Sequence, residues 1–169
     1  MTEPVLTNLT RKSLITPKMG FNQMRNALYW LQRIMKQFDL SEEEIFHRLK
    51  SMGANIGATF FQELSPNSSN LPNLVKELYK ITLNSKVSVL QNENKLYVED
   101  KNCALCKYKY EDIQIPGCNI SVGMIQEILE RSGYKVISGE VIESKALGNK
   151  SCIHEFQIEQ EVKSSGQYF

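Results

Sequence analysis

All four cysteines of this 169-residue chain lie after residue 102, at Cys103, Cys106, Cys118 and Cys152. The first two form a C-x2-C step in a polar segment, and the last lies in a strand-like run far downstream. Their sulfurs can meet only if the fold brings the two ends of the C-terminal half together. Thiolate-rich sites suit zinc. The sequence therefore predicts one structural zinc site with these four cysteines as its ligands.

Other interpretations of the cysteines stay open. They would be reduced thiols buried as small hydrophobes, or a disulfide or redox switch. No secretory signal or run of about 20 apolar residues is visible, so we expect a cytoplasmic protein, where disulfides are disfavoured and metal binding is favoured. Glu140, Glu143 or His154 would be substitutes for one sulfur. Three sulfurs and a water would make an open, catalytic site, but no general base is arranged to support it.

Composition and missing motifs narrow the function further. The net charge is +1, from 20 basic and 19 acidic residues, which argues against broad electrostatic binding of nucleic acid. The chain has no phosphate-binding P-loop, no dinucleotide-binding G-x-G-x-x-G, no H-E-x-x-H and no G-x-S-x-G. We therefore expect a protein that is not an enzyme.

Hydrophobic periodicity predicts an alternation of helices and hairpins. Apolar residues at three- and four-residue steps indicate helices over 21–38, 42–64 and 73–83, and a fourth that Cys118 opens. Alternating patterns predict a hairpin over 86–99 and strands over 134–144 and 151–159. This order favours an α+β fold with helices packed on one face of a twisted antiparallel sheet. The expected organisation is a flexible arm over 1–19, one domain over 20–160 and a frayed tail over 161–169.

The second predicted helix carries two local signals. Ser41 and Glu44 form a capping-box pattern at its start. Gly53 and Gly57 form a row of small residues with two alanines, which serves either close packing against another backbone or space for a ligand.

Two segments resemble known families. Met52-Gly53-x-Asn55-Ile56-Gly57 resembles the second-helix signature of TRAPP vesicle-tethering subunits. Pro116-Gly117-Cys118 through Gly123, with Gly148-Asn149-Lys150-Ser151-Cys152, is similar to the vinyl-4-reductase domain. The two families share one fold, and together the likeness spans about Gly20 to Glu159. It implies a prokaryotic, archaeal-type relative that forms a dimer through its first two helices, with itself or with a related subunit.

The resemblance also implies an apolar cavity between helices and sheet. We expect it to hold a lipid or hydrocarbon and to be lined by Phe60, Phe61, Leu78, Ile81, Met124 and Ile128. In TRAPP subunits an acyl chain is attached to a cysteine shortly before the third helix, and the corresponding Ser65 to Asn70 has none, so only a free ligand would enter. Cys118 and Cys152 match metal-binding positions of the vinyl-4-reductase domain, whereas a further family cysteine corresponds to Ser144.

The resulting hypothesis is a non-enzymatic, dimeric scaffold and binding module with a structural zinc site. The family likeness adds a role in vesicle transport, peripheral to a membrane and in a small-GTPase complex. The alternative is a sensor domain of the vinyl-4-reductase type for aromatic or hydrocarbon molecules. An enzyme acting on a tetrapyrrole is a third interpretation, and the sequence supplies no catalytic residues for it.

Overall fold

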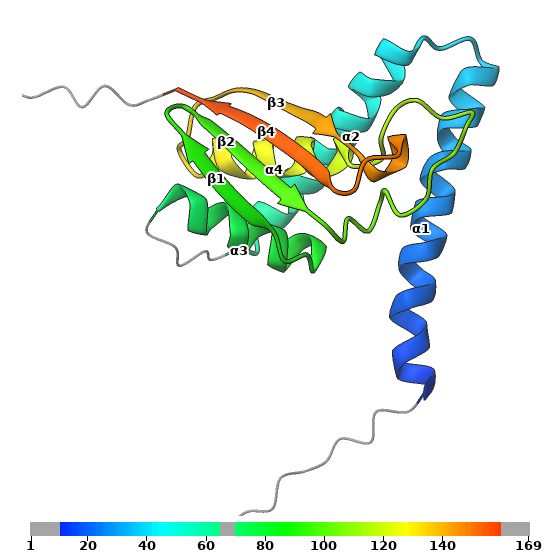
Figure 1. The fold of residues 1–169 in the computed structure, drawn as a ribbon, viewed down its shortest axis with the longest axis horizontal. Helices are drawn as coiled ribbons and strands as arrows, with labels where there is room; N and C mark the ends of the chain where they lie inside the picture. The colour runs from blue at the N-terminus through cyan, green and yellow to red at the C-terminus, as the bar shows by residue number, and fades with distance from the viewer. Residues whose placement is uncertain (1–10, 65–69, 160–169) are drawn as a thin grey trace, which may run out of the picture.

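The computed structural model describes residues 11–64 and 70–159. In chain order, the elements are α1 (Arg11–Gln37), α2 (Glu42–Phe61), α3 (Leu71–Leu83), β1 (Ser88–Asn92), β2 (Lys95–Asp100), α4 (Asn119–Arg131), β3 (Val136–Glu143), the 3₁₀ turn η1 (Lys145–Leu147) and β4 (Cys152–Ile158). Figure 1 shows the sheet backed by helices on one side, with α1 set apart from it. The predicted α+β fold is confirmed.

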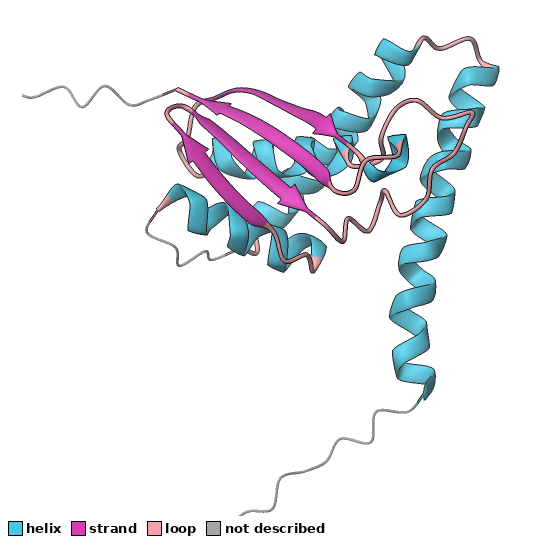
Figure 2. Cartoon of the chain, viewed as in Figure 1, coloured by secondary structure: helices cyan, strands magenta, loops and turns pink. Residues whose placement is uncertain are grey.

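The sheet has the order β1-β2-β4-β3, and every neighbouring pair is antiparallel. Buried and less buried residues alternate along β2 and β4, as expected for strands with one covered face. Helices α3 and α4 pack against that face, and α2 packs on α4. Figure 2 shows this separation of helices from strands.

Strand β3 is an edge strand with two register shifts, between Val136 and Ser138 and between Val141 and Glu143. Ile137 and Ile142 are the extra residues, and both are more than half exposed, at 54% and 51%. Each shift is a β-bulge, which bends the strand and raises its local twist.

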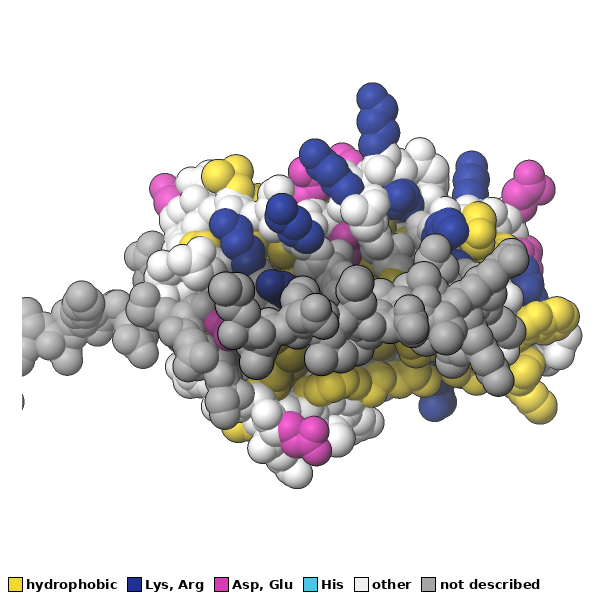
Figure 3. All heavy atoms as spheres, turned by 90° about the horizontal axis from the view of Figure 1, so that it is seen from below, with side chains coloured by type: hydrophobic (Ala, Val, Ile, Leu, Met, Phe, Trp, Pro, Cys, Tyr) yellow, Lys and Arg dark blue, Asp and Glu magenta, His cyan; other side chains and the backbone are white. Residues whose placement is uncertain are grey.

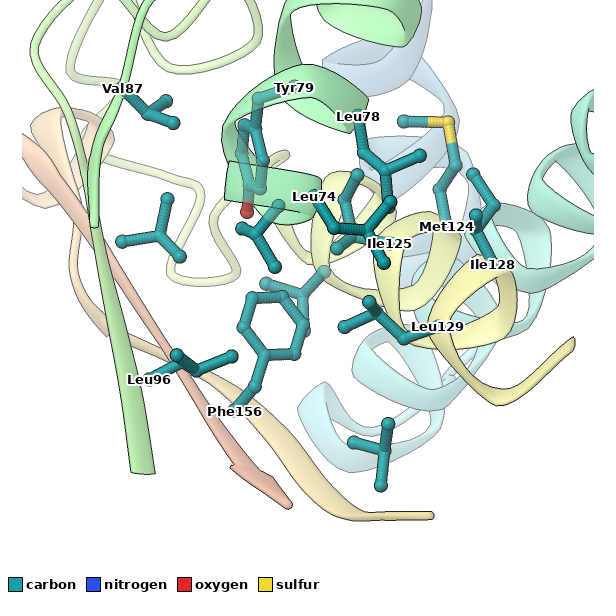
Figure 4. Close-up of a cluster of buried hydrophobic side chains, with 14 of the residues drawn as sticks. Leu74, Leu78, Tyr79, Val87, Leu96, Met124, Ile125, Ile128, Leu129 and Phe156 are labelled. Atoms are coloured by element: carbon teal, nitrogen blue, oxygen red, sulfur yellow. The ribbon is translucent and has the colours of Figure 1, made fainter. Parts of the chain in front are cut away.

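The buried side chains form two clusters. The first lies between the sheet and helices α3 and α4 (Figure 4), and it includes Leu78, Leu96, Ile125 and Phe156. The second contains all four cysteines with apolar side chains from three helices, namely Leu28 of α1, Ile45 and Leu49 of α2, and Ile120 of α4. The fold therefore places the cysteines in a core of their own beside the main core.

Helices α2 and α4 meet backbone to backbone. A Cβ atom added to Gly53 would overlap the carbonyl oxygen of Ile120, and one added to Gly123 would overlap that of Lys50. A Cβ atom added to Gly57 would likewise lie too close to the carbonyl oxygen of Met124, at 2.5 Å. The small-residue row of α2 thus serves close packing, which was one of its two predicted roles.

Helix starts agree with the sequence in one case and differ in another. The capping box of α2 is present, because the Glu44 amide donates to Ser41 Oγ at 3.2 Å and the Ser41 amide donates to Glu44 Oε2 at 2.8 Å. Helix α1, by contrast, begins at Arg11 and not at Phe21. A proline disfavours an interior helical position, yet this 27-residue helix continues on both sides of Pro17. The predicted tail over 161–169 lies outside the described residues, as do residues 1–10 of the arm.

Candidate metal centre

The structure brings the four cysteine sulfurs together. The Sγ atoms of Cys103, Cys106, Cys118 and Cys152 all lie within 4.8 Å of one another. All four side chains are buried, and none forms a disulfide. The predicted convergence of these residues is confirmed, although the first and the last are 49 positions apart in the sequence (103 to 152).

The sheet register explains how distant cysteines become neighbours. Asp100, the last residue of β2, pairs with Cys152, the first residue of β4. Cys103 therefore follows directly from the strand end beside Cys152. The amide of Cys106 donates to the carbonyl of Cys103 at 3.4 Å, and this tight turn presents two sulfurs from one short segment.

Cys118 reaches the cluster from the start of α4. It is the N-cap residue of that helix and makes no side-chain capping hydrogen bond. The amide and the side-chain amide of Asn119 both donate to the carbonyl of Pro116, at 3.2 and 2.9 Å. These bonds fix the turn that aims Cys118 inward.

The proton affinities of the sulfurs are strongly linked. Hydrogen bonds from Cys103, Cys106 and Cys118 lower the pKa of Cys152. The backbone amide of Lys145 also donates to Cys152 Sγ at 3.4 Å. Burial raises the pKa of Cys118 well above its usual value, and its hydrogen bonds to the other three cysteines raise it further. Hydrogen bonds from Cys103 and Cys118 also lower the pKa of Cys106. Thiolates are thus favoured at Cys152 and Cys106, and a cation is needed before Cys103 and Cys118 ionise readily.

The donor set fits a zinc ion. A regular tetrahedron with Zn–S bonds of about 2.3 Å has sulfurs roughly 3.8 Å apart, within the 4.8 Å span found here. Glu140, Glu143 and His154 do not belong to the group of potential ligands among the described residues. His154 Nδ1 is instead 2.7 Å from Tyr79 Oη. The arrangement suits a closed four-sulfur site.

Side chains around the cluster were not anticipated from the sequence. Arg25 Nε donates to the carbonyl of Ala104 at 2.7 Å, and Tyr29 Oη donates to that of Leu105 at 3.0 Å. Both carbonyls lie between Cys103 and Cys106. The i, i+4 spacing of Arg25 and Tyr29 indicates a shared helix face, but it does not indicate the loop that this face meets.

Ser144 also lies at the cluster, with its Oγ 3.7 Å from Cys152 Sγ. This is the position that the vinyl-4-reductase resemblance matched to a further metal cysteine. The C-x2-C pair supplies two sulfurs and so compensates for the ligand that is missing at Ser144.

The six predicted cavity residues have different environments. Leu78, Met124 and Ile128 belong to the main core, where they point toward one another (Figure 4), and Phe61 packs against that core. Phe60 and Ile81 are exposed, at 37% and 50%. A hollow of about 860 Å³ lies elsewhere, between α1 and α2, and we call it the α1–α2 hollow. Its lining residues are Leu31, Met35, Glu44, His47, Arg48, Leu49, Ser51, Met52, Asn55, Ile56 and Thr59.

Large apolar side chains are also exposed in the α1 region and on α2. Trp30, Ile34 and Phe38 of the α1 region are 59%, 45% and 75% exposed, and Ile56 of α2 is 37% exposed. Seen from below, most of the visible hydrophobic side chains lie in the lower half of the view, and most of the lysines and arginines lie in the upper half (Figure 3). Such apolar groups on a surface are typical of an interaction site.

The fold has counterparts among solved structures. Subunit 3 of a trafficking protein particle complex from Naegleria fowleri, covalently bound to palmitic acid, is similar with a TM-score of 0.66 and 17% identity, over 85% of this chain and 97% of that one. An H-NOX protein from S. oneidensis in the Fe(II)NO state has a TM-score of 0.53 and 11% identity, over 79% and 74%. An H-NOX mutant from K. algicida has a TM-score of 0.51 and 14% identity, over 84% and 75%.

The sequence itself matches no family model and no curated protein. The structural likeness therefore establishes a shared fold with a TRAPP subunit and with H-NOX proteins. Within the described ranges, no helix combines the length and apolarity needed to cross a membrane.

Proposed function

We propose that this protein is a non-enzymatic, dimeric binding module stabilised by one zinc ion on Cys103, Cys106, Cys118 and Cys152. The observation that carries the proposal is the convergence of four buried, unpaired sulfurs within 4.8 Å. Zinc has no redox chemistry of its own and accepts four thiolates in tetrahedral geometry. Bound there, it would join the end of β2, the start of α4 and the start of β4.

The dimer would form through α1 and α2, with a second copy or a related subunit. Exposed Trp30, Ile34 and Phe38 support this surface, since dimer interfaces are enriched in aromatic and aliphatic side chains. The TRAPP-type fold supports it as well. We propose further that this dimer belongs to a larger assembly in vesicle transport. That assembly would include a small GTPase or lie at a membrane surface.

The ligand would be a lipid or hydrocarbon held without a covalent bond. The similar TRAPP subunit is covalently bound to palmitic acid, whereas every cysteine of this chain lies in the metal cluster. The α1–α2 hollow is lined in part by Leu31, Met35, Leu49 and Met52, which supports an apolar occupant. An occupant of the core near Leu78 and Ile128 would instead require these packed side chains to move.

The second candidate is a small-molecule sensor domain, and it is supported by the likeness to H-NOX proteins. In that function, a bound aromatic or hydrocarbon molecule would change the contacts of the dimer. Both candidates use the same apolar surface and the same metal centre.

Native mass spectrometry of the purified protein tests the proposal. We expect a dimer with one zinc per chain and an additional lipid mass. The lipid mass should disappear under denaturing conditions, because no cysteine is free to retain it covalently. A monomer with no zinc would contradict the proposal, while a zinc-bound dimer that binds an aromatic molecule and no lipid would favour the sensor.

A further inference from the structure

Four side chains on α1 contact the loop that carries three of the cysteines. We call residues 101–118 the cysteine loop. Besides the bonds of Arg25 and Tyr29 to its carbonyls, Arg33 pairs with Asp112, and Lys36 Nζ donates to the carbonyl of Asp112 at 2.9 Å. The first three of these side chains recur every four residues, so they form a stripe along one face of α1.

Aromatic rings extend the same contact. The Tyr29 ring lies 4.2 Å from the Tyr110 ring, measured between centroids. The Arg33 guanidinium lies over the same Tyr110 ring, at 5.5 Å from its centroid. Figure 1 shows the cysteine loop and η1 between α1 and the sheet. The loop is therefore the structural link by which this face of α1 is joined to the rest of the molecule.

The cysteine loop has little regular structure of its own. No helix or strand is present from residue 101 to residue 118, all of which are described. Its backbone hydrogen bonds include isolated turns, such as Cys106 to Cys103 and Ile113 to Tyr110, both at 3.4 Å. Holding such a loop in one conformation costs entropy, and an ion on Cys103, Cys106 and Cys118 would fix both ends of it.

The rest of the molecule has independent support. Among the residues whose side chains the structure describes, the main core between the sheet and helices α3 and α4 contains no cysteine and no residue of α1. Helix α2 is held against α4 by the backbone contacts at Gly53 and Gly123. By contrast, Leu28 of α1 belongs to the cluster that surrounds the sulfurs. Loss of an ion should therefore loosen the cysteine loop and α1 before it loosens the sheet.

Helix α1 also forms one wall of the α1–α2 hollow, through Leu31 and Met35, while α2 supplies Leu49, Met52 and Ile56. We propose that metal on the four cysteines fastens α1 to the cysteine loop, so that metal occupancy controls the position of α1 and the shape of the α1–α2 hollow. The inference rests on the metal site of the proposed function. The coupling between metal binding and the position of α1 is reciprocal, because any contact that holds α1 in place also strengthens metal binding.

Hydrogen exchange on the full chain tests this, with zinc bound and after its removal by a chelator under reducing conditions. Amides of residues 23–37 of α1 should exchange about tenfold faster without zinc, a typical size of coupling between two sites. Amides of α3 and β2 should change little. The single tryptophan, Trp30 on α1, gives a second readout through its fluorescence. Unchanged α1 protection overturns the inference, and so does equal loss of protection in α3 and β2.

Two variants distinguish the contact between α1 and the cysteine loop from the metal site itself. Arg25→Met combined with Tyr29→Phe removes both hydrogen bonds to the loop carbonyls but leaves all four sulfurs in place. This variant should still bind one zinc, with α1 amides that exchange about as fast as in the zinc-free protein. Asn26→Ala, an exposed position on the same helix, is the control and should retain full protection. Protein that binds no zinc contradicts the proposed function as well, whereas zinc binding without an effect on α1 contradicts this inference alone.

Discussion

Tyr79 Oη lies 2.7 Å from His154 Nδ1, and both side chains are fully buried. Tyr79 belongs to α3 and His154 to β4, two residues after Cys152. Burial raises the pKa of Tyr79 well above its usual value, so the hydroxyl keeps its proton. The bond therefore joins the main core to the strand that delivers one sulfur to the metal centre.

Replacing Tyr79 with phenylalanine should lower the free energy of unfolding by about 1–3 kcal/mol, because His154 Nδ1 would be left buried without its partner. Urea titration at neutral pH measures this. Tyr108→Phe, on a 48% exposed ring, is the control, and it should change stability by less than about 0.5 kcal/mol. Equal stability of Tyr79→Phe and wild type would show that the bond contributes nothing.

Replacing Cys118 with serine should abolish zinc binding and lower the melting temperature. A structural zinc contributes directly to folding, and a loss of about 2 kcal/mol corresponds to about 4–8 °C in a chain of this size. Metal analysis and calorimetry measure the two effects. Lys107→Ser in the same loop is exposed and should change neither. A melting temperature unaffected by Cys118→Ser would count against a structural metal.

An alanine at Gly53 should destabilise the protein, because its Cβ would overlap the carbonyl oxygen of Ile120 and force α2 away from α4. Overpacking of this kind costs about 1–3 kcal/mol. Chemical unfolding followed by circular dichroism measures it. Ser51→Ala, on an exposed position of the same helix, should be neutral or slightly stabilising. If both variants were equally stable, the two helices could not be in backbone contact.

The Arg33–Asp112 pair predicts a pH dependence. The hydrogen bond from Arg33 holds the pKa of Asp112 below its usual value. Asp112 should therefore stabilise the fold above the pKa it has when unfolded, about 3.9, and this contribution should disappear as the pH falls through the lower, folded value. Wild type should be more stable than Asp112→Asn at pH 7, and the difference should shrink as the pH falls below about 3.9 and vanish below the folded pKa of Asp112.

Denaturant titrations at several pH values measure that difference, with Glu111→Gln as the control for loss of a neighbouring exposed carboxylate. A difference between wild type and Asp112→Asn that persists unchanged into acid would show that the ionised pair is not its source.

A charge at Trp30 should disrupt the proposed dimer. The side chain is 59% exposed on α1, and an aspartate there would be buried without compensation in an interface between copies. Size-exclusion chromatography with light scattering should show Trp30→Asp at the mass of a monomer. Gln91→Asp, on the exposed hairpin, should leave the mass unchanged. A dimer that persists in Trp30→Asp would place the interface elsewhere.

Local signals predicted much of this fold. The capping box of Ser41 and Glu44 located the start of α2, and alternating apolar residues located the hairpin of β1 and β2. The sequence does not predict the first turns of α1, because Pro17 and Gly20 are poor residues for a helix interior by local rules. Local signals act through neighbouring residues, and they succeeded where the structure depends on those.

The metal centre was predictable in part. The four cysteines all lie after residue 102, and two of them form a C-x2-C step. This pattern indicated that the four sulfurs converge on one site. Arg25 and Tyr29 were not identified, since their partners lie 79 and 76 positions away. Leu78 and Ile128 illustrate another limit, because a packed core and a cavity wall require the same apolar side chains.

The two bulges of β3 have a consequence for the behaviour of the protein at high concentration. An edge strand offers unpaired amides and carbonyls to a neighbouring chain, and a flat, regular edge leads to fibrils. Ile137 and Ile142 interrupt the spacing of those groups at two places within eight residues. A strand from another molecule could align with only a few of them, so the isoleucines protect this edge from growth into an amyloid-like ladder despite being apolar.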